Sequence, residues 1–358
     1  MTTRRAWPTG WTFGVCLWVL LFIAGARADA GTLPSRLSDE EFWRIVQQFS
    51  ERAGTFPSDN LLSNERTLQQ VIPELTRQVK PGGVYLGVGP EQNFTYMVAL
   101  RPRMAFIFDI RRGNMALHLL YKALFELSAD RAELISRLFC RKRPPGLTAS
   151  VSVAQMFDAF AREPSTEDLY VQNVRAVVNQ LTRKHGFVLS ADDLLRLQHD
   201  YRAFYLYGPA IQYSSSRNAG RREREPTYVD LMAATDSDGQ LRAYLASEES
   251  FAFLKQLETD NLIVPLVGNF IGPKAIRAVG DYLKERGATV SAFYVSNVEQ
   301  YLRQDGTWPR FCANVAALPL DDLSTFIRSV RDQTPNSVFD LISELGPIVP
   351  EVRDCGPD

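Results

Sequence analysis

The chain has 358 residues, of which 45% are hydrophobic and 23% charged, so a disordered or low-complexity protein is excluded and one large or two ordinary domains are allowed. Its 40 basic and 41 acidic side chains give a net charge of −1, and no binding of nucleic acid or of an anionic membrane surface is expected from the total charge. Three histidines and four cysteines offer few ligands, so no metal site is expected.

The first 28 residues have the pattern of a secretory signal peptide. Arg4 and Arg5 precede an apolar run over residues 11–25, and an A-x-A cleavage pattern ends at Ala28. This pattern predicts a periplasmic or secreted protein. The run is shorter than the roughly 20 residues that span a bilayer, yet an uncleaved N-terminal membrane segment stays open as the alternative. Without residues 1–28 the chain carries 37 basic against 41 acidic residues, a net charge of −4.

Three cysteines remain after such cleavage: Cys140, Cys312 and Cys355. In an oxidising compartment two of them are expected to pair. Two interpretations stay open: a disulfide between Cys312 and Cys355 that fixes the C-terminal tail, or a buried Cys312 beside a loose Cys355.

Residues 29–80 are predicted to form N-terminal helices. The first is opened by a capping box at Ser38 and runs to about Glu51, with apolar residues on one face. A second helix is predicted over residues 64–78.

Residues 81–140 alternate between buried strands and helices and form the first half of a sheet domain. Strands are predicted at 84–88 and 104–109, and helices at 92–100 and 114–140, the last divided in one reading by Ser128 acting as an internal cap. This order favours a parallel sheet.

Residues 141–261 have few convincing strands and are interpreted as a mostly helical insertion. Helices are predicted there at 153–161, 166–184, 191–204 and 247–258. Residues 262–358 are the second half of the sheet domain with a C-terminal tail; strands are predicted at 262–267 and 288–295, and a helix at 274–286 with Pro273 at its first position. The whole pattern predicts an α/β, Rossmann-like fold with helical additions at the N-terminus and in the middle.

The turn between the first two predicted strands is the main candidate site. The first strand ends in Gly87-x-Gly89, and the second ends in Asp109, 20 residues after Gly89. Glycines let a ligand approach the backbone, and an acid at this spacing accepts hydrogen bonds from ribose hydroxyls. The turn therefore predicts an adenosine- or nucleotide-like cofactor, with a tight structural turn as the alternative.

Two residues after this turn disfavour a phosphate ligand. Glu91 and Gln92 occupy positions where glycine would admit a pyrophosphate, and the acids Glu91 and Asp109 suit a ligand with a sugar and a cation. Residues 84–138, and more loosely 262–297, resemble class I methyltransferases. That resemblance implies a methyltransferase-type sheet and S-adenosylmethionine as cofactor.

Other polar residues follow the predicted strands and complete the candidates for cofactor binding, because ligands in open α/β sheets lie at the carboxyl ends of strands. They are Gln92, Asn93, Arg111, Asn114, Asn269 and Asn297. The alternative for each is a cap or turn residue that bonds its own backbone.

The segments 85–96 (YLGVGPEQNFTY) and 295–301 (VSNVEQY) resemble an uncharacterised bacterial family that is often exported and has a methyltransferase-like fold. This resemblance implies the fold and supplies no reaction. No Gly-x-Ser-x-Gly motif is present, so no hydrolase nucleophile is predicted.

Two functions stay open. One is an exported protein of unknown activity that binds a small molecule or a protein partner. The other is an S-adenosylmethionine-dependent methyltransferase with an unknown substrate and no identified catalytic residue. The export signal favours the first, because the methyl donor is made in the cytoplasm.

Overall fold

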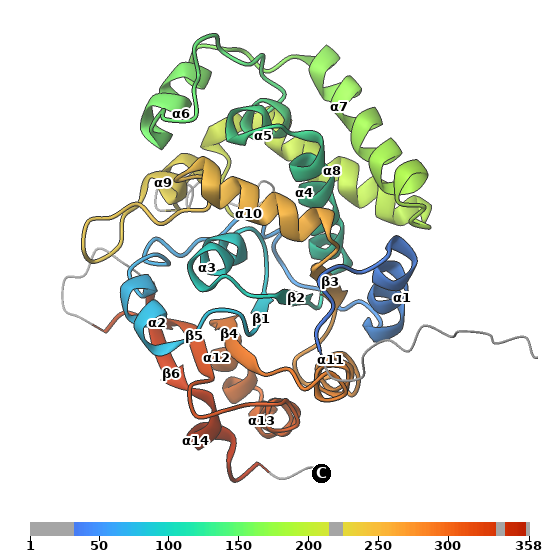
Figure 1. Ribbon diagram of the computed structural model, residues 1–358, viewed down its shortest axis with the longest axis vertical. Helices are drawn as coiled ribbons and strands as arrows, with labels where there is room; N and C mark the ends of the chain where they lie inside the picture. The colour runs from blue at the N-terminus through green and yellow to red at the C-terminus, as the bar shows by residue number, and fades with distance from the viewer. Residues whose placement is uncertain (1–31, 215–224, 334–340, 356–358) are drawn as a thin grey trace, which may run out of the picture. The chain divides into compact units, whose positions relative to one another are not determined.

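A computed structural model describes residues 32–214, 225–333 and 341–355 (Figure 1). Its centre is a six-stranded sheet in the order β3-β2-β1-β4-β5-β6. The strands are β1 (Val84–Val88), β2 (Met104–Asp109), β3 (Ile263–Val267), β4 (Val290–Ser296), β5 (Thr325–Arg331) and β6 (Leu341–Pro347). Neighbouring strands are parallel from β3 through β5, and β6 is antiparallel to β5. The expected α/β fold with a mostly parallel sheet is confirmed.

Helices cover both faces of the sheet, which is why β2 and β3 are buried along their whole length. On one face α3 (Gln92–Leu100) packs on β1, and α4 (Arg112–Leu127) packs on β2 and β3, with α10 (Glu248–Thr259) against both helices. The other face holds α11 (Ala275–Lys284), with α1 (Asp39–Phe49) beside it against β3, and α13 (Trp308–Ala316) (Figure 1).

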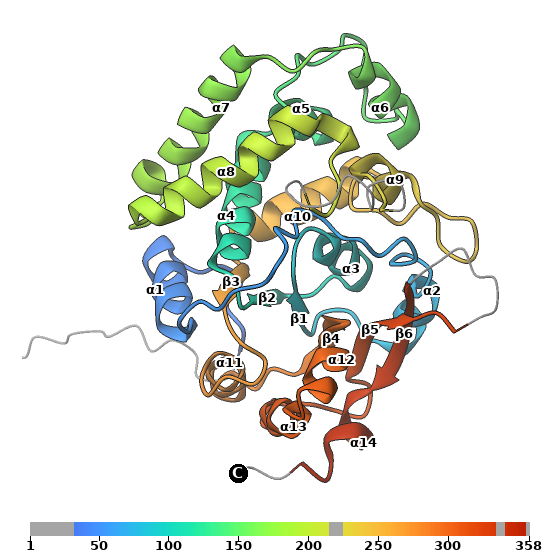
Figure 2. The same cartoon turned by 180° about the vertical axis from the view of Figure 1, so that it is seen from behind.

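The insertion between β2 and β3 is helical, as predicted. It contains α5 (Arg131–Leu138), α6 (Val153–Ala161), α7 (Glu167–Asn179) with a π-helical turn (Gln180–Lys184), α8 (Ala191–Tyr207), a 3₁₀ turn (Gly208–Ala210) and α9 (Tyr228–Ala233). Figure 2 shows α5, α6, α7 and α8 on the α4 side of the sheet, where α8 lies along α4. Capping boxes begin α6 at Ser152 and α8 at Ser190, and such local signals explain why these starts could be predicted.

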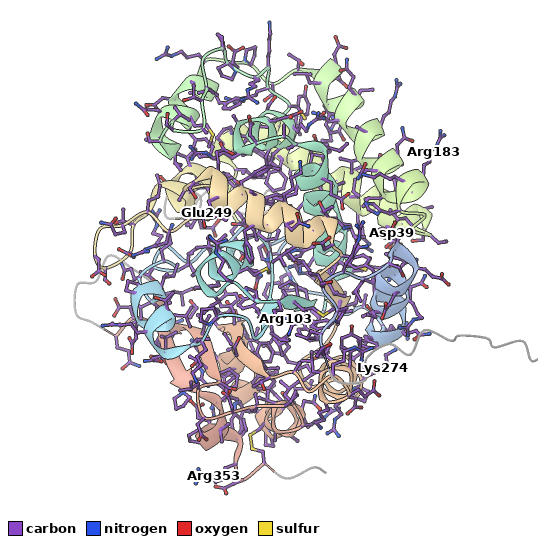
Figure 3. The ribbon with its side chains drawn as sticks, in the orientation of Figure 1. Asp39, Arg103, Arg183, Glu249, Lys274 and Arg353 are labelled. Atoms are coloured by element: carbon purple, nitrogen blue, oxygen red, sulfur yellow. A yellow bond between two sulfur atoms is a disulfide. The ribbon has the colours of Figure 1, made fainter. Side chains whose placement is uncertain are left out.

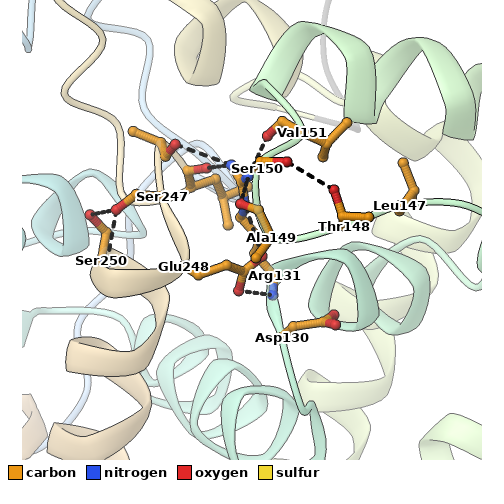
Figure 4. Close-up of polar contacts among 12 residues, drawn as sticks. Asp130, Arg131, Leu147, Thr148, Ala149, Ser150, Val151, Ser247, Glu248 and Ser250 are labelled. Carbon is orange, nitrogen blue, oxygen red and sulfur yellow. Dashed lines mark hydrogen bonds and ion pairs between the residues drawn. The ribbon is translucent and has the colours of Figure 1, made fainter.

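A single arginine holds the start of this insertion together (Figure 4). The buried guanidinium of Arg131, at the start of α5, donates from Nε to Glu248 of α10 at 2.9 Å. Its remaining N–H groups donate to four backbone carbonyls, those of Leu245, Ala246, Ala149 and Val151. Arg131 thus joins three separate segments of the chain.

The predicted helix over 64–78 is wrong in its first half, because α2 is only Ile72–Gln78. The polar side chains before it bind distant segments. Gln69 donates from Nε2 to the carbonyl of Leu231, and the Thr67 hydroxyl accepts from the backbone N–H of Ser343. These tertiary hydrogen bonds hold the segment in turns.

The predicted helix over 114–140 is two helices, and Ser128, the predicted internal cap, lies at their junction as the C-cap of α4. Ser128 ends α4, with its hydroxyl donating to the carbonyl of Leu124, and Asp130 caps α5 by accepting from the Glu133 N–H. Pro273 is outside its helix, since α11 begins at Ala275.

The C-terminal part is more regular than the predicted tail. It contains β5, β6, α12 (Val298–Gln304) and α14 (Ile348–Val352) in addition to α13. Cys312 of α13 and Cys355 are joined by a disulfide across 43 positions, in the part of the molecule where Figure 3 labels Arg353. Cys140 is buried and free. Across the described ranges, none of the helices has the length and apolar character needed to cross a membrane. The predicted signal peptide, residues 1–28, lies outside them.

Candidate cavity at the carboxyl edge of the sheet

A cavity of about 680 Å³ opens at the carboxyl ends of the parallel strands. It lies where β1 is flanked by β2 on one side and β4 on the other, the position at which open α/β sheets bind ligands. The strand ends contribute Gly89, Asp109, Gly268, Asn269, Ser296 and Asn297. A second wall comes from the segment before α2, with Phe56 and Glu65 among its residues.

Of the ten residues predicted as candidates for cofactor binding, the cavity brings together five in addition to Asn297. They are Gly89, Gln92, Asp109, Arg111 and Asn269. Asn297, a candidate by topology, also lies in the wall. Asn269 is at the same time a turn residue, because its Oδ1 accepts from the N–H of Ile271 at 3.1 Å.

Gly87 and Asn93 do not line the cavity and act on the turn itself. The side-chain amide of Asn93 donates to the carbonyls of Val88 and Pro90 at 3.0 and 2.7 Å and accepts from the Tyr85 hydroxyl at 2.9 Å. A Cβ on Gly87 would lie 1.9 Å from Asn93 Oδ1. Gly87 is therefore needed for the packing of Asn93.

Two side chains of α4 hold the backbone carbonyl of Gly89 in place. Its carbonyl accepts from Nδ2 of Asn114 at 3.1 Å and contacts Nε2 of His118 at 2.9 Å, and its φ of +78° suits glycine. Asn114 thus supports the turn and does not line the cavity.

Glu91 also lies behind the wall. One carboxylate oxygen accepts from the N–H of Ser63 at 3.2 Å, and the other has no hydrogen-bond partner within the described ranges. Burial raises the pKa of Glu91 to about 8. A buried carboxyl of this kind holds a proton at neutral pH and is not the cation-binding acid that the sequence predicts.

We expect Glu91→Gln to stabilise the protein increasingly as pH rises. The folded pKa lies above the unfolded value of 4.5, so the wild type binds its proton more tightly when folded and loses that stability between pH 4.5 and 8. Glutamine does not titrate, so the variant should gain about 4 kcal/mol over the wild type at pH 8 and about 1 kcal/mol at pH 5. Urea unfolding at both pH values measures this. Glu74→Gln, at an exposed glutamate of α2, should change neither value, and a loss of stability in Glu91→Gln at pH 8 would contradict the assignment.

The Asp109 carboxylate already accepts hydrogen bonds from the neighbouring Arg111. Arg111 donates to the Asp109 carboxylate from its backbone N–H at 2.8 Å, from Nε at 3.0 Å and from Nη2 at 2.7 Å. The guanidinium also donates to the carbonyl of Asp59. The predicted ribose acceptor is therefore already neutralised and hydrogen-bonded within the chain.

The most distinctive chemistry of the cavity comes from residues that the sequence did not single out. Oε1 of Glu65 accepts from the hydroxyls of Tyr294 and Ser296, at 2.7 and 2.5 Å. Gln92 Nε2 in turn donates to the Tyr294 oxygen at 3.1 Å. Tyr294 and Ser296 are two positions apart in β4, the strand is irregular between them, and both hydroxyls reach the same carboxylate.

Burial raises the pKa of Glu65, although the hydrogen bonds from Ser296 and Tyr294 act in the opposite direction. The second oxygen of Glu65, Oε2, and the side-chain oxygen of Gln92 are buried and have no hydrogen-bond partner in the described part of the chain. The hydroxyl of Ser329 lies near enough to Glu65 to lower its pKa but makes no hydrogen bond of normal geometry. Two acceptors at this wall therefore lack donors, which in a protein interior costs about 1–3 kcal/mol each.

A comparison of the sequence with models of known protein families shows the family of the chain. The model of a family described as "Domain of unknown function (DUF7790)" matches residues 61–202 and 210–342, more than three quarters of the chain. The chain belongs to this family. A search of curated proteins finds no match. The DUF7790 match contains Glu65, Gln92, Tyr294 and Ser296, whereas Phe56 lies outside it.

Candidate metal ligands are scattered. No group of three or more His, Cys, Asp or Glu side chains is placed to hold a metal ion within 32–214, 225–333 and 341–355. His118 is buried beneath Gly89, and His185 lies between the carboxylates of Asp39 and Glu126.

Proposed function

We propose that the chain is an exported protein that binds a small polar molecule in the cavity at the carboxyl edge of its sheet. The observation that carries this proposal is the pair of buried acceptors without donors, Glu65 Oε2 and Gln92 Oε1, in the cavity wall. A ligand with N–H or O–H groups would satisfy both. The volume of about 680 Å³ is in the range of small-molecule pockets, which favours a small molecule over a protein partner.

The disulfide supports the proposed periplasmic or secreted location. Stable disulfides such as Cys312–Cys355 are characteristic of oxidising compartments and rare in the cytosol. Fractionation of cells with N-terminal sequencing tests the location: we expect a chain that begins at Asp29 outside the cytoplasm. Intact chain with Met1 in the cytoplasm would contradict it.

A second candidate, an S-adenosylmethionine-dependent methyltransferase, is favoured by the sheet. The order β3-β2-β1-β4-β5 followed by an antiparallel strand resembles the class I methyltransferase arrangement. Gly89 and Asp109 lie at the cavity as that cofactor would require. Arg111 opposes this candidate because it already occupies the Asp109 carboxylate.

Thermal-shift titration tests both candidates. The panel consists of small amines, amides and alcohols, together with S-adenosylmethionine, its demethylated product and NAD. A ligand at 100 times its dissociation constant adds about 2.7 kcal/mol to stability. We expect at least one polar compound to stabilise the wild type, Gln92→Leu to lose the response, and Ser291→Ala, at the opposite end of β4, to keep it. No response from any compound, or an equal response in Gln92→Leu, would contradict the binding proposal.

A further inference from the structure

Ser296 has a backbone conformation that serine seldom adopts. It is the last residue of β4, its φ is +51°, and α12 begins two residues later at Val298. A residue with a Cβ is strained in this region, and such strain persists where the surrounding structure enforces it, commonly at functional sites. A strained serine between a strand and a helix exposes its hydroxyl at the edge of the sheet, which is how the nucleophile of many α/β hydrolases is presented.

The hydroxyl of Ser296 has a proton acceptor. It donates to Oε1 of Glu65 at 2.5 Å, within the reach required of a general base. Burial raises the pKa of Glu65, so its carboxylate is a stronger base than an exposed one. Tyr294 holds the same oxygen at 2.7 Å and fixes the orientation of the carboxylate. Ser296 is half-buried and lines the cavity, so a bound molecule can reach it.

The residue after Ser296 offers a hydrogen-bond donor for the negative charge that would develop on the carbonyl oxygen of a substrate. Asn297 lines the same cavity, and its side-chain amide makes no hydrogen bond to any described residue. Amide N–H groups of this kind stabilise the oxyanion of a tetrahedral intermediate.

We propose that Ser296 is a nucleophile that accepts an acyl group from an ester bound in the cavity, with Glu65 as its general base and Asn297 as a donor to the oxyanion. This inference rests on the proposed function, since the ester would be a small polar molecule held in the cavity that also carries an N–H or O–H donor for Glu65 Oε2 and Gln92 Oε1.

The steps balance within these residues. Ser296 Oγ attacks the ester carbonyl carbon while its proton passes to Glu65, and the carbonyl oxygen becomes an oxyanion near Asn297. The intermediate then collapses, the bond to the alcohol oxygen breaks, and the alcohol leaves with the proton from Glu65. Water attacks the acyl-serine ester, gives a proton to Glu65 and releases the carboxylic acid, and the proton returns to Ser296 Oγ.

The test uses the protein with a fluorophosphonate probe, which phosphonylates activated serines with loss of fluoride, and with p-nitrophenyl acetate as the ester. We expect one added phosphonyl group on Ser296, mapped by peptide mass spectrometry. Both labelling and ester cleavage should fall at least 100-fold in Ser296→Ala. Glu65→Gln should lower both by about 10²- to 10⁴-fold and abolish the rise of the rate with pH that a carboxylate base produces.

Two variants separate chemistry from folding. Ser296→Gly removes the hydroxyl but suits a positive φ, so relief of backbone strain offsets part of the lost hydrogen bond to Glu65, and the variant should fold and still be inactive. Ser291→Ala removes another hydroxyl of β4 and should label and cleave normally. Unlabelled wild type that still responds to polar compounds in the thermal-shift panel would overturn the nucleophile alone. Loss of both responses would overturn the binding proposal with it, and equal labelling of Ser296→Gly and wild type would also overturn the nucleophile.

Discussion

Arg131→Met is expected to lower the free energy of unfolding by about 3–5 kcal/mol, the usual result of removing one partner from a buried ion pair. The Arg131 side chain is 2% exposed and binds Glu248 as well as four backbone carbonyls. Methionine fills a similar volume but donates nothing, so these acceptors lose their donors. Chemical unfolding of the purified protein measures the loss.

Arg143→Met is the matched control. Arg143 pairs with Asp130 through two hydrogen bonds, at 2.8 and 2.7 Å, but their side chains are 39% and 32% exposed. Exposed pairs contribute less than about 1 kcal/mol, so this variant should unfold almost like the wild type. Equal losses in the two variants would contradict the assignment of Arg131 as the link between α5 and α10.

Removal of the disulfide by Cys312→Ala with Cys355→Ala should lower the free energy of unfolding by about 4 kcal/mol. The bond closes a loop of 43 positions in the unfolded chain. The conformational entropy that this closure removes from the unfolded state corresponds to about 4 kcal/mol of stability. The bond joins the end of the chain after β6 to α13, which α14 also contacts.

A reducing agent provides the internal control. Dithiothreitol should bring the wild type to the stability of the double variant and leave the variant unchanged. A loss below about 1 kcal/mol in both comparisons would show that the packing of Ile348 and Val352 alone fixes the C-terminal segment.

Local patterns in the sequence were sufficient where burial follows from the residues themselves. The apolar runs of β1 and β2 are buried over at least their first four residues, and Ser152 and Ser190 start their helices with the side-chain bonds that their types favour. β5 was missed because Arg328 interrupts its apolar pattern. That arginine is accommodated by pairing with Glu299 and Glu351, which only the fold brings near it.

Only some of the residues that line the cavity were candidates from the sequence. Gly89, Gln92 and Asp109 follow their strands and reach the cavity, as the topology requires. Glu65 gave no such signal, because it lies in a segment with helical spacing, and the partner of its carboxylate, Tyr294, is 229 positions away. Gly87 was a candidate for ligand approach, and the fold shows a constraint that the sequence does not, which is the close approach of the Asn93 amide.

The most direct test of the central claim, that the cavity at the carboxyl edge is a ligand site, is a crystal structure of the protein soaked with small amines, amides and alcohols. The structure predicts bound molecules in the cavity with an N–H or O–H donor within hydrogen-bonding distance of Glu65 Oε2 and Gln92 Oε1, and none there in Gln92→Leu. Molecules bound only outside this cavity, or equal occupancy in Gln92→Leu, would contradict it.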